Sequence, residues 1–254
     1  AESVAAQTRV CKWSIYVSRR DIGCATDLAR NYSDLVRVEE YPVELVGAIA
    51  QREWLYNRLL RKERGLVVHV DADDVLGGDR VQHVIDAWEK DNDSALYLSQ
   101  LRYLNDQQSN VMNLPQTIKS PFDLSLSNCV GLSHVAFNVS VLNKLFPEGF
   151  KFINDIIALD WFIAVDALAR GGRIISDKGI VYYRVYEGNV AGDPSLKSDN
   201  RRNRVQQVKS AHYAALESVG LANCTPGVAP ESGLEEKMSD FAKRNWRNWW
   251  WGSC

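Results

Sequence analysis

The stretch Leu66-Val-Val-His-Val-Asp-Ala-Asp-Asp-Val-Leu76 joins an apolar, largely β-branched run to a group of carboxylates. The run over 66–70 is the pattern of a strand that is buried on both faces. Asp71, Asp73 and Asp74 follow it directly. Because open α/β sheets bind ligands at the carboxyl ends of their strands, these carboxylates are candidate functional groups.

Strands and helices are predicted to alternate on both sides of this stretch. A helix that starts at Asp79 places on one face the apolar residues Val81, Val84, Ile85 and Trp88. The other expected strands cover 13–18, 35–39 and 95–101, and the other expected helices cover 21–31 and 42–63. This alternation predicts an α/β fold with a mostly parallel central sheet and helices on both faces.

The second half of the chain is less regular. Residues 102–134 are rich in Asn, Gln, Ser and Pro, so we expect a long functional or mobile loop. The segment 187–204 is polar and is expected to be flexible. The expected elements are helices over 155–170 and 205–219 and short strands over 173–176 and 180–184, with a Gly/Pro linker over 220–232.

Asp71 and Asp73 are two hard oxygen donors spaced two residues apart. Mg²⁺ and Mn²⁺ are commonly held by one or two carboxylates together with water and phosphate oxygens. The pair therefore predicts a divalent metal that binds a diphosphate. The alternative is an acidic turn that caps the helix from Asp79.

Asp160 is the second candidate, because apolar residues surround it in the helical segment 155–166. Desolvation raises the pKa of a carboxyl group and suits it to general-base catalysis. The alternatives are a helix cap or a structural pair with Arg170.

Together these two segments resemble family 2 glycosyltransferases with the GT-A (nucleotide-diphospho-sugar transferase) fold. The stretch 66–76 looks like the DxD-bearing strand of that family. The stretch LDWFIAVDALARGGRIISDKGIVYYRVYEGNVAG (Leu159 to Gly192) resembles its Glu-Asp-Trp helix, Gly-Gly turn and closing Tyr-Arg-x-His-x-x-Asn strand. The similarity extends over residues 13–192, and the order and spacing of the motifs both fit.

The resemblance implies a metal-dependent, inverting transfer of a sugar from a nucleotide-diphosphate donor, with UDP the commonest nucleotide of the family. Asp71, Ala72 and Asp73 would bind the donor, and Asp71 and Asp73 would hold Mn²⁺ or Mg²⁺, with Asp73 favoured as the direct ligand. Asp160 would be the base that deprotonates an acceptor hydroxyl, with Trp161 beside it at the acceptor. Arg184 would contact phosphate.

Two departures from the family pattern place parts of that site in doubt. Leu159 stands where the family usually has Glu, so one acceptor-binding carboxylate is missing. Tyr186 stands where a His often helps to hold the metal or the diphosphate.

The amino-terminal half fits the family in two ways. If 13–18 is the first strand, Ser18 and Arg19 line the nucleoside pocket and Glu39 or Glu40 replaces the usual base-binding Asp. If 13–18 is the second strand, the first is missing or reduced to residues 1–10. We favour the first register, because the number of helices before the acidic turn then fits without truncation; the glutamates could also be exposed strand-end charges.

Cationic and histidine side chains supply further candidates. Arg201, with Arg202 and Arg204, could close over the diphosphate, or the segment could be an exposed helix start. His134 lies where the acceptor side should begin, although a lone His is more often structural.

We divide the chain into a glycosyltransferase domain over 1–192 and a carboxy-terminal helical extension over 193–254. Within the domain, 11–101 would be the nucleotide-sugar half and 102–192 the acceptor half. The tail alternates tryptophans with cations, namely Trp246, Trp249, Trp250 and Trp251 with Lys243, Arg244 and Arg247. This pattern suits a lipid interface and a lipid-linked acceptor.

The tail also has other interpretations. Its rings could pack on the domain or on a second subunit of a homodimer, or they could lie over the acceptor cleft and stack on sugar. The Gln-x-x-Arg-Trp motif and membrane helices of processive synthases are absent from the sequence, which favours transfer of a single sugar.

Composition excludes several classes of protein. Lys and Arg number 30 and Asp and Glu 32, giving a net charge of −2, which argues against nucleic-acid binding. The scattered cysteines, five in all, are expected to be free thiols in a reducing compartment. With neither a signal peptide nor a spanning apolar run, we expect a cytoplasmic protein with at most peripheral membrane contact.

Two rival functions remain. The run VVHVDADDVL also resembles the haloacid-dehalogenase-type phosphatases, in which Asp71 would be the nucleophile and Asp73 the acid/base. That motif normally opens its fold, whereas here it lies well inside the chain. The second rival is a catalytically inactive nucleotide- or glycan-binding module, which Leu159 and Tyr186 suggest.

Overall fold

The computed structural model describes residues 2–9, 11–32, 36–62, 65–152, 155–186, 199–226 and 231–252. Its strands are β1 (Trp13–Val17), β2 (Val36–Glu40), β3 (Leu66–Val68), β4 (Val75–Leu76), β5 (Leu96–Tyr103), β6 (Thr117–Ile118), β7 (Val135–Asn138) and β8 (Ile174–Tyr183). Its α-helices are α1 (Glu2–Ala5), α2 (Ile22–Arg30), α3 (Ala48–Lys62), α4 (Arg80–Lys90), α5 (Val139–Leu145), α6 (Leu159–Ala169), α7 (Asp199–Ser218), α8 (Glu231–Glu235) and α9 (Asp240–Asn245). Short 3₁₀ turns are η1 (Pro121–Leu124), η2 (Leu132–His134), η3 (Ala222–Cys224) and η4 (Trp246–Asn248).

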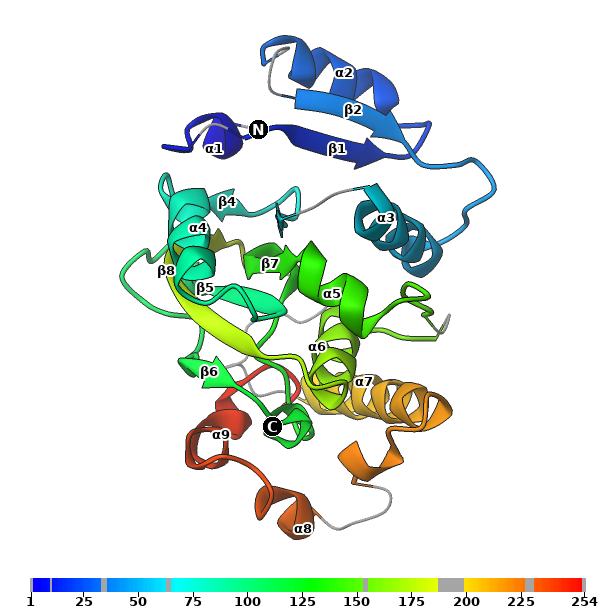
Figure 1. Ribbon diagram of the computed structural model, residues 1–254, viewed down its shortest axis with the longest axis vertical. Helices are drawn as coiled ribbons and strands as arrows, with labels where there is room; N and C mark the ends of the chain where they lie inside the picture. Colours follow the sequence, from blue (N-terminus) through cyan, green and yellow to red (C-terminus); the bar gives the residue numbers. More distant parts are fainter. Residues whose placement is uncertain are drawn as a thin grey trace.

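These elements confirm the predicted α/β class. Within the described ranges β1 and β2 form a small parallel sheet, and the larger sheet has the order β3-β7-β5-β8-β4, with β6 also paired to β8. The strands β1 and β2, with α2, lie at one end of the molecule, and α8 and α9 lie at the other (Figure 1). Among the described residues β1 is the first strand, and the strand of the family to which it corresponds stays a prediction.

The strand directions correct the prediction of a mostly parallel sheet. Of the described pairings, β1–β2 and β5–β8 are parallel, whereas β3–β7, β5–β7, β4–β8 and β6–β8 are antiparallel. The difference comes from short strands that the sequence did not predict. Strand β7 enters between β3 and β5 and runs against both, and β4 and β6 each run against β8. Residues 174–183, expected as parts of two short strands, form the single strand β8 with a register shift opposite Leu98 and Gln100.

Helices cover both faces of the larger sheet, as predicted. Successive side chains of a strand point to opposite faces, so β5 reports on both sides. Tyr97 packs with Val84 of α4 and Ala136 of β7 on one face. Leu96 and Leu98 belong to the main core on the other face, together with residues of α3, α5 and α6.

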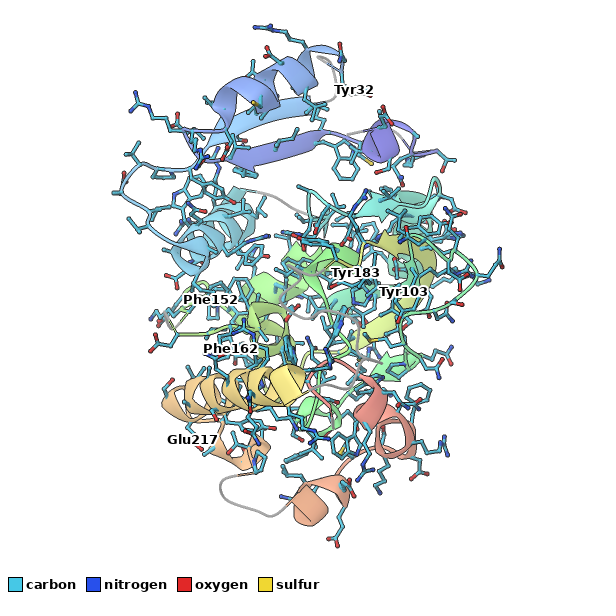
Figure 2. All side chains as sticks on the ribbon, turned by 180° about the vertical axis from the view of Figure 1, so that it is seen from behind. Tyr32, Tyr103, Phe152, Phe162, Tyr183 and Glu217 are labelled. Atoms are coloured by element: carbon cyan, nitrogen blue, oxygen red, sulfur yellow. The ribbon has the colours of Figure 1, made fainter. Side chains whose placement is uncertain are left out.

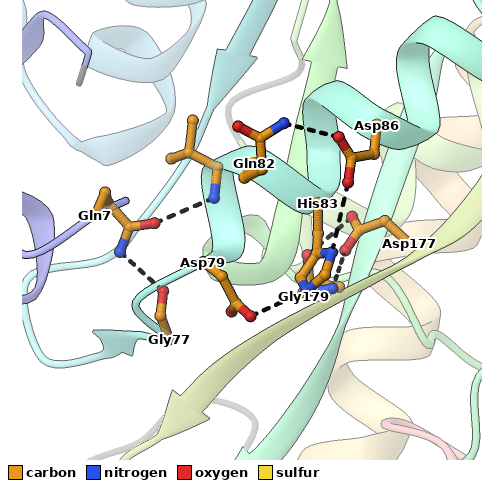
Figure 3. Close-up of polar contacts among 10 residues, drawn as sticks. Gln7, Gly77, Asp79, Gln82, His83, Asp86, Asp177 and Gly179 are labelled. Atoms are coloured by element: carbon orange, nitrogen blue, oxygen red, sulfur yellow. Dashed lines mark hydrogen bonds and ion pairs between the residues drawn. The ribbon is translucent and has the colours of Figure 1, made fainter. Parts of the chain in front are cut away.

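Helix α4 begins where Asp79 was expected to start it, but a distant side chain caps it. The Gln7 Oε1 accepts a hydrogen bond from the Val81 backbone N–H at 3.1 Å, and its Nε2 donates to the Gly77 carbonyl at 2.8 Å (Figure 3). Asp79 makes no cap of its own and instead contacts His83 Nε2 at 3.0 Å. Gln7 therefore ties the amino-terminal segment to the turn between β4 and α4.

The carboxy-terminal tail packs into the main core. Four tryptophans are at most 4% exposed and share that core with residues of α6 and α7, namely Trp246, Trp249, Trp250 and Trp251. Packing on the domain is therefore the interpretation that the structure supports for these rings, and they are not available to a lipid surface. No described helix is both long and apolar enough to cross a bilayer.

The boundary between domain and extension stays a prediction, although the described part of the extension shares the main core. Of the segment expected to be flexible, residues 187–198 lie outside the described residues, and residues 199–204 form the first turns of α7.

Close packing of the tail makes Gly131 sensitive to substitution. A Cβ atom on Gly131 would lie 2.9 Å from Cη2 and Cζ3 of Trp250. We expect Gly131→Ala to lower the free energy of unfolding by about 1–3 kcal/mol, because overpacking must displace the indole. Urea denaturation followed by tryptophan fluorescence measures this difference.

Gly23→Ala in α2 is the matched control, because nothing lies within 4 Å of its Cβ position. Alanine there should be neutral or should stabilise by up to about 1 kcal/mol through helix propensity. Equal unfolding midpoints for Gly131→Ala and the parent protein would contradict the described seating of Trp250.

Candidate functional site

One cavity of about 360 Å³ collects the predicted carboxylates. Asp71 and Asp73 from the turn after β3 line it, as does Asp160 from the start of α6. Tyr183 at the end of β8, labelled near the middle of the molecule in Figure 2, lines it as well. Its other walls come from α3, β5, η2, the start of α6 with the residues before it, the acidic turn, the segment after β8 and the tail. The other lining residues are Ala48, Ile49, Arg52, Asp74, Leu101, Gly131, Leu132, Ser133, His134, Ile157, Ala158, Leu159, Tyr186, Trp250 and Trp251.

Both carboxylate oxygens of Asp71 are held by neighbouring side chains. Arg52 Nη2 donates to Oδ1 at 3.1 Å, and Ser133 Oγ donates to Oδ2 at 2.9 Å. Burial alone would raise the pKa of Asp71, but the charge of Arg52 and these hydrogen bonds outweigh it and lower the pKa. Asp71 is therefore a fixed carboxylate on the cavity wall.

The half-buried side chain of His69 orients Arg52. His69 Nε2 lies 3.1 Å from Arg52 Nη1 and 3.3 Å from the Tyr56 hydroxyl. Burial, followed by the charge of Arg52, lowers the pKa of His69 to about 4, so its ring is neutral at pH 7. A neutral ring can accept a hydrogen bond at Nε2, and Arg52 is thereby directed at Asp71.

Asp73 and Asp74 are joined to the strand end beyond Tyr183. Arg184 Nε donates to the Asp73 carbonyl at 3.0 Å, and the Arg184 backbone N–H donates to Asp74 Oδ1 at 3.1 Å. The Tyr186 hydroxyl hydrogen-bonds to the Asp73 carboxylate, which raises the pKa of the phenol. Burial raises the pKa of Asp74 to about 6. Tyr186 thus lies beside Asp73, where the family resemblance expects a histidine.

Asp160 lies on the first turn of α6 and is half-buried. Its Oδ1 accepts hydrogen bonds from the Trp161 backbone N–H at 2.7 Å and from Asn128 Nδ2 at 3.2 Å. Burial raises the pKa of Asp160 to about 7, and the charge of Asp71 acts in the same direction, against the Trp161 hydrogen bond. Asp160 can therefore gain or lose a proton near neutral pH, as a general base requires.

The acidic turn offers hard oxygen donors for a divalent ion. No cluster of three or more His, Cys, Asp or Glu suited to a metal occurs among the described residues. Mg²⁺ and Mn²⁺ bound with a nucleotide need only one or two carboxylates, because phosphate oxygens and water complete the shell. Asp73, with Asp71 beside it, fits such an ion.

Three residues predicted for the nucleoside pocket do not line this cavity. Ser18 Oγ donates to Asp21 Oδ2 at 2.6 Å in the turn after β1. Glu39 of β2 pairs with Arg58 of α3 and accepts a hydrogen bond from the Tyr16 hydroxyl at 3.3 Å. Arg19 is exposed in the same turn as Ser18. Ala72, between the two aspartates, is also exposed and does not line the cavity.

Trp161 does not reach the cavity, contrary to its predicted place at the acceptor. Its ring is fully buried and stacks on His212 of α7 at 3.7 Å between centroids. Its Nε1 donates to the Leu124 carbonyl at 2.6 Å. Arg201 lies on the first turn of α7 and is not among the lining residues.

His134 lines the cavity but has both ring nitrogens engaged. Nε2 accepts a hydrogen bond from the Gly131 N–H at 2.7 Å, and Nδ1 lies 2.7 Å from the Ser99 carbonyl. Burial lowers the pKa of His134 to about 4. These bonds shape the η2 loop, as the structural interpretation of a lone histidine expects, and His134 is not placed to bind an acceptor through its nitrogens.

Sequence reasoning missed several residues of the site. Arg52 lies on α3, which looks ordinary in sequence, and Ser133 lies in the segment expected to be irregular. His69 directly follows β3 within the stretch quoted first, but it was not singled out. The tail tryptophans carried a signal, because one interpretation placed them over the cleft, and Trp250 and Trp251 do line the cavity.

Comparison with known proteins identifies the fold. No protein-family model and no curated protein matches the sequence. The structure is similar to S. aureus TarS, with a TM-score of 0.51, 12% identity, and coverage of 96% of this chain and 47% of that one. It is also similar to GalNAc-T7 in complex with UDP, GalNAc and Mn²⁺, with a TM-score of 0.50, 13% identity, and coverage of 92% and 50%.

The chain therefore spans about half the length of each of these two proteins. At this level of identity the likeness shows the fold, and the expected GT-A fold of glycosyltransferases is confirmed.

Proposed function

We propose that this chain is a metal-dependent glycosyltransferase that moves a sugar from a UDP-sugar to an acceptor hydroxyl, with inversion at the anomeric carbon. One observation carries the proposal. A single cavity in a GT-A fold joins a pair of carboxylates of the kind that holds a divalent metal, Asp71 and Asp73, to a separate carboxyl group with a pKa near neutrality, Asp160.

The donor would bind along the acidic turn. Asp73 and Asp71 would hold Mn²⁺ or Mg²⁺, which when bound offsets the negative charge that develops on the leaving diphosphate. Arg52 lines the cavity, and Arg184 is bonded to the Asp73 carbonyl, so guanidinium groups flank the place where phosphate oxygens would lie. The similar GalNAc-T7 structure contains UDP and Mn²⁺, which supports this class of donor.

The acceptor would bind on the α6 side of the cavity. Asp160 takes the proton of the acceptor hydroxyl while the hydroxyl oxygen attacks the anomeric carbon from the face opposite the diphosphate. The bond from the anomeric carbon to oxygen of the diphosphate breaks, and its electrons leave with the nucleotide. Asp160 then releases its proton to water.

The phosphatase rival is weakened by the fold, because the confirmed fold is that of GT-A glycosyltransferases. The hydrogen bonds from Arg52 and Ser133 do not separate the two functions, since each oxygen of Asp71 keeps a second lone pair. The inactive-module rival has one observation in its favour. Leu159, which replaces the expected carboxylate, is buried at the cavity wall and leaves an apolar surface beside Asp160.

Asp73 and Asp160 should have separable roles. With Mn²⁺ present, Asp73→Ala should weaken UDP binding by about 10–100-fold, as the loss of a metal ligand does. Asp160→Asn should leave UDP affinity within about 3-fold and lower the rate of transfer by about 10²–10⁴-fold, because only the proton acceptor is lost. Titration calorimetry with UDP and nucleotide release from a panel of UDP-sugars measure the two effects.

Asp27→Asn is the control for that pair, because Asp27 lies on α2 in an exposed ion pair with Arg30. It should change neither quantity. Cleavage of a phosphomonoester with no nucleotide preference would transfer the assignment to the phosphatase, and UDP binding without transfer to any acceptor would transfer it to the inactive module.

The rate of transfer should depend on the ionisation of Asp160. Since only the carboxylate can accept a proton, kcat/KM should rise with pH and level off above an apparent pKa of about 7. The measurement is transfer at saturating Mn²⁺ in overlapping buffers from pH 5 to about 9. A flat profile across pH 7 would argue against Asp160 as the base.

The ionisation of Asp160 should also make the stability of the folded protein depend on pH in the absence of substrate. The folded state, with the Asp160 pKa at about 7, holds this proton more tightly than the unfolded chain, whose carboxyl has the ordinary value of 3.8. Stability therefore falls as pH rises between these two values. Asp160→Asn removes this loss, so its gain in Tm over the parent should grow from pH 4 to about 7 and then stay constant.

The gain at pH 8 should be at least about 2 °C for a chain of this size. Scanning calorimetry of both proteins measures it, and Asp74, which titrates in both, cancels in the difference. A gain in Tm that does not change with pH would show that Asp160 has an ordinary pKa.

A further inference from the structure

The tail is joined to the wall of the cavity by the backbone of Asn128. The Asn128 N–H donates to the Trp250 carbonyl at 2.8 Å, and the two residues form an isolated antiparallel bridge. Trp250 and Trp251 line the cavity. The last described residues of the chain therefore lie beside the candidate site.

The Asn128 side chain connects this bridge to Asp160. Its Oδ1 accepts a hydrogen bond from the Val130 N–H at 2.9 Å, which fixes the orientation of the amide. The amide nitrogen consequently faces two acceptors, the Val130 carbonyl at 2.6 Å and Asp160 Oδ1 at 3.2 Å. Asn128 is fully buried, so it has no freedom to turn away.

The tail is held firmly where it meets Asn128. The Trp250 ring lies edge-on to His134 at 6.1 Å and to Tyr183 at 5.9 Å between centroids. Trp251 has a φ of 62°, and it is the one non-glycine residue with positive φ in the described part of the chain. Such a conformation costs about 1–3 kcal/mol and persists only where the surroundings fix it.

We propose that Asn128 is a positioning residue for Asp160, and that the tail segment 249–252 holds Asn128 in place and is thereby a component of the catalytic site. Asn128 and Trp161 both donate to Oδ1 of Asp160. The other oxygen, Oδ2, is then the atom that takes the acceptor proton. This inference rests on the proposed role of Asp160 as the base.

The proposal is tested with two variants that remove the amide donor. Asn128→Ala removes the whole amide. Asn128→Asp keeps the shape and the acceptor for the Val130 N–H, but it places a second carboxylate against Asp160. Asn138→Ala is the control, because Asn138 is equally buried and its amide donates to the Asn92 and Ser94 carbonyls, away from the cavity.

The first readout is the pKa of Asp160, measured by carboxyl ¹³C NMR and assigned with Asp160→Asn. Losing a donor to the charged form should raise this pKa in Asn128→Ala, and the second carboxylate should raise it further in Asn128→Asp. Four other groups that act electrostatically with Asp160 are unchanged in these variants, namely Arg52, Tyr56, Asp71 and Tyr183.

The second readout is transfer. In both variants kcat at pH 7 should fall by about 10-fold or more, while the KM for the UDP-sugar stays within about 3-fold. The pH profiles should shift upwards in the same order as the NMR values. Asn138→Ala should lower Tm without moving the profile.

The tail is tested by Trp250→Ala, which removes the ring that seats the carbonyl. It should raise the pKa of Asp160 in the same direction as Asn128→Ala, and an unchanged pKa would overturn the part of the proposal that concerns the tail.

An Asp160 pKa in Asn128→Ala and Asn128→Asp equal to that of the parent would overturn the positioning role. If the alanine variant does not fold, the near-isosteric aspartate variant decides the question alone. A shifted pKa together with absence of transfer in the parent protein would support the positioning contact and refute the proposed function, so the two failures are distinguishable.

Discussion

The burial of α6 is the constraint on which the candidate site depends. Every residue from Leu159 to Leu168 is buried except Asp160. Burying each large apolar side chain contributes about 1.5–3 kcal/mol. Together these side chains fix the helix against the sheet, and the position of Asp160 is thereby fixed as well. The carboxyl group of Asp160 therefore lies in largely apolar surroundings. Hydrogen bonds from the Trp161 N–H and the Asn128 amide offset part of the free-energy cost of burying it.

The acidic turn on the opposite wall of the cavity brings several carboxylates close together. Asp71, Asp73 and Asp74 lie within one turn, where like charges oppose one another. Arg52 offsets the charge of Asp71, whereas Asp74, with its pKa raised to about 6, is still mostly ionised at pH 7. His69 supports this arrangement, because its neutral ring accepts a hydrogen bond from Arg52 without adding a positive charge. More carboxylates than guanidinium groups therefore lie at this wall, which favours a cation there.

Local patterns in the sequence predicted the acidic turn, α4 and the buried setting of Asp160, because each depends on neighbours along the chain. Features that depend on contacts between residues far apart in the chain could not be predicted from local patterns. Strand β7 has only four residues, and its place between β3 and β5 is a matter of tertiary pairing. Trp161 follows Asp160 directly, but consecutive residues of a helix point about 100° apart, so one faces the cavity and the other the core. A row of tryptophans and cations has the same appearance at a lipid interface and in a packed tail.

The contact between the tail and Asn128 is made by main-chain atoms, and this decides what the tail must preserve. Asn128 contacts the carbonyl of Trp250, which any residue could supply. The path of the tail backbone, in contrast, restricts which residues can occupy the tail. A Cβ on Gly252 would lie 2.5 Å from the Trp246 carbonyl, so only glycine fits there, and Trp251 must hold a left-handed conformation. Because the burial of the tryptophans outweighs that strain, the tail and the cavity wall beside Asp160 form together, and we expect a change that loosens the tail to loosen the position of Asp160 as well.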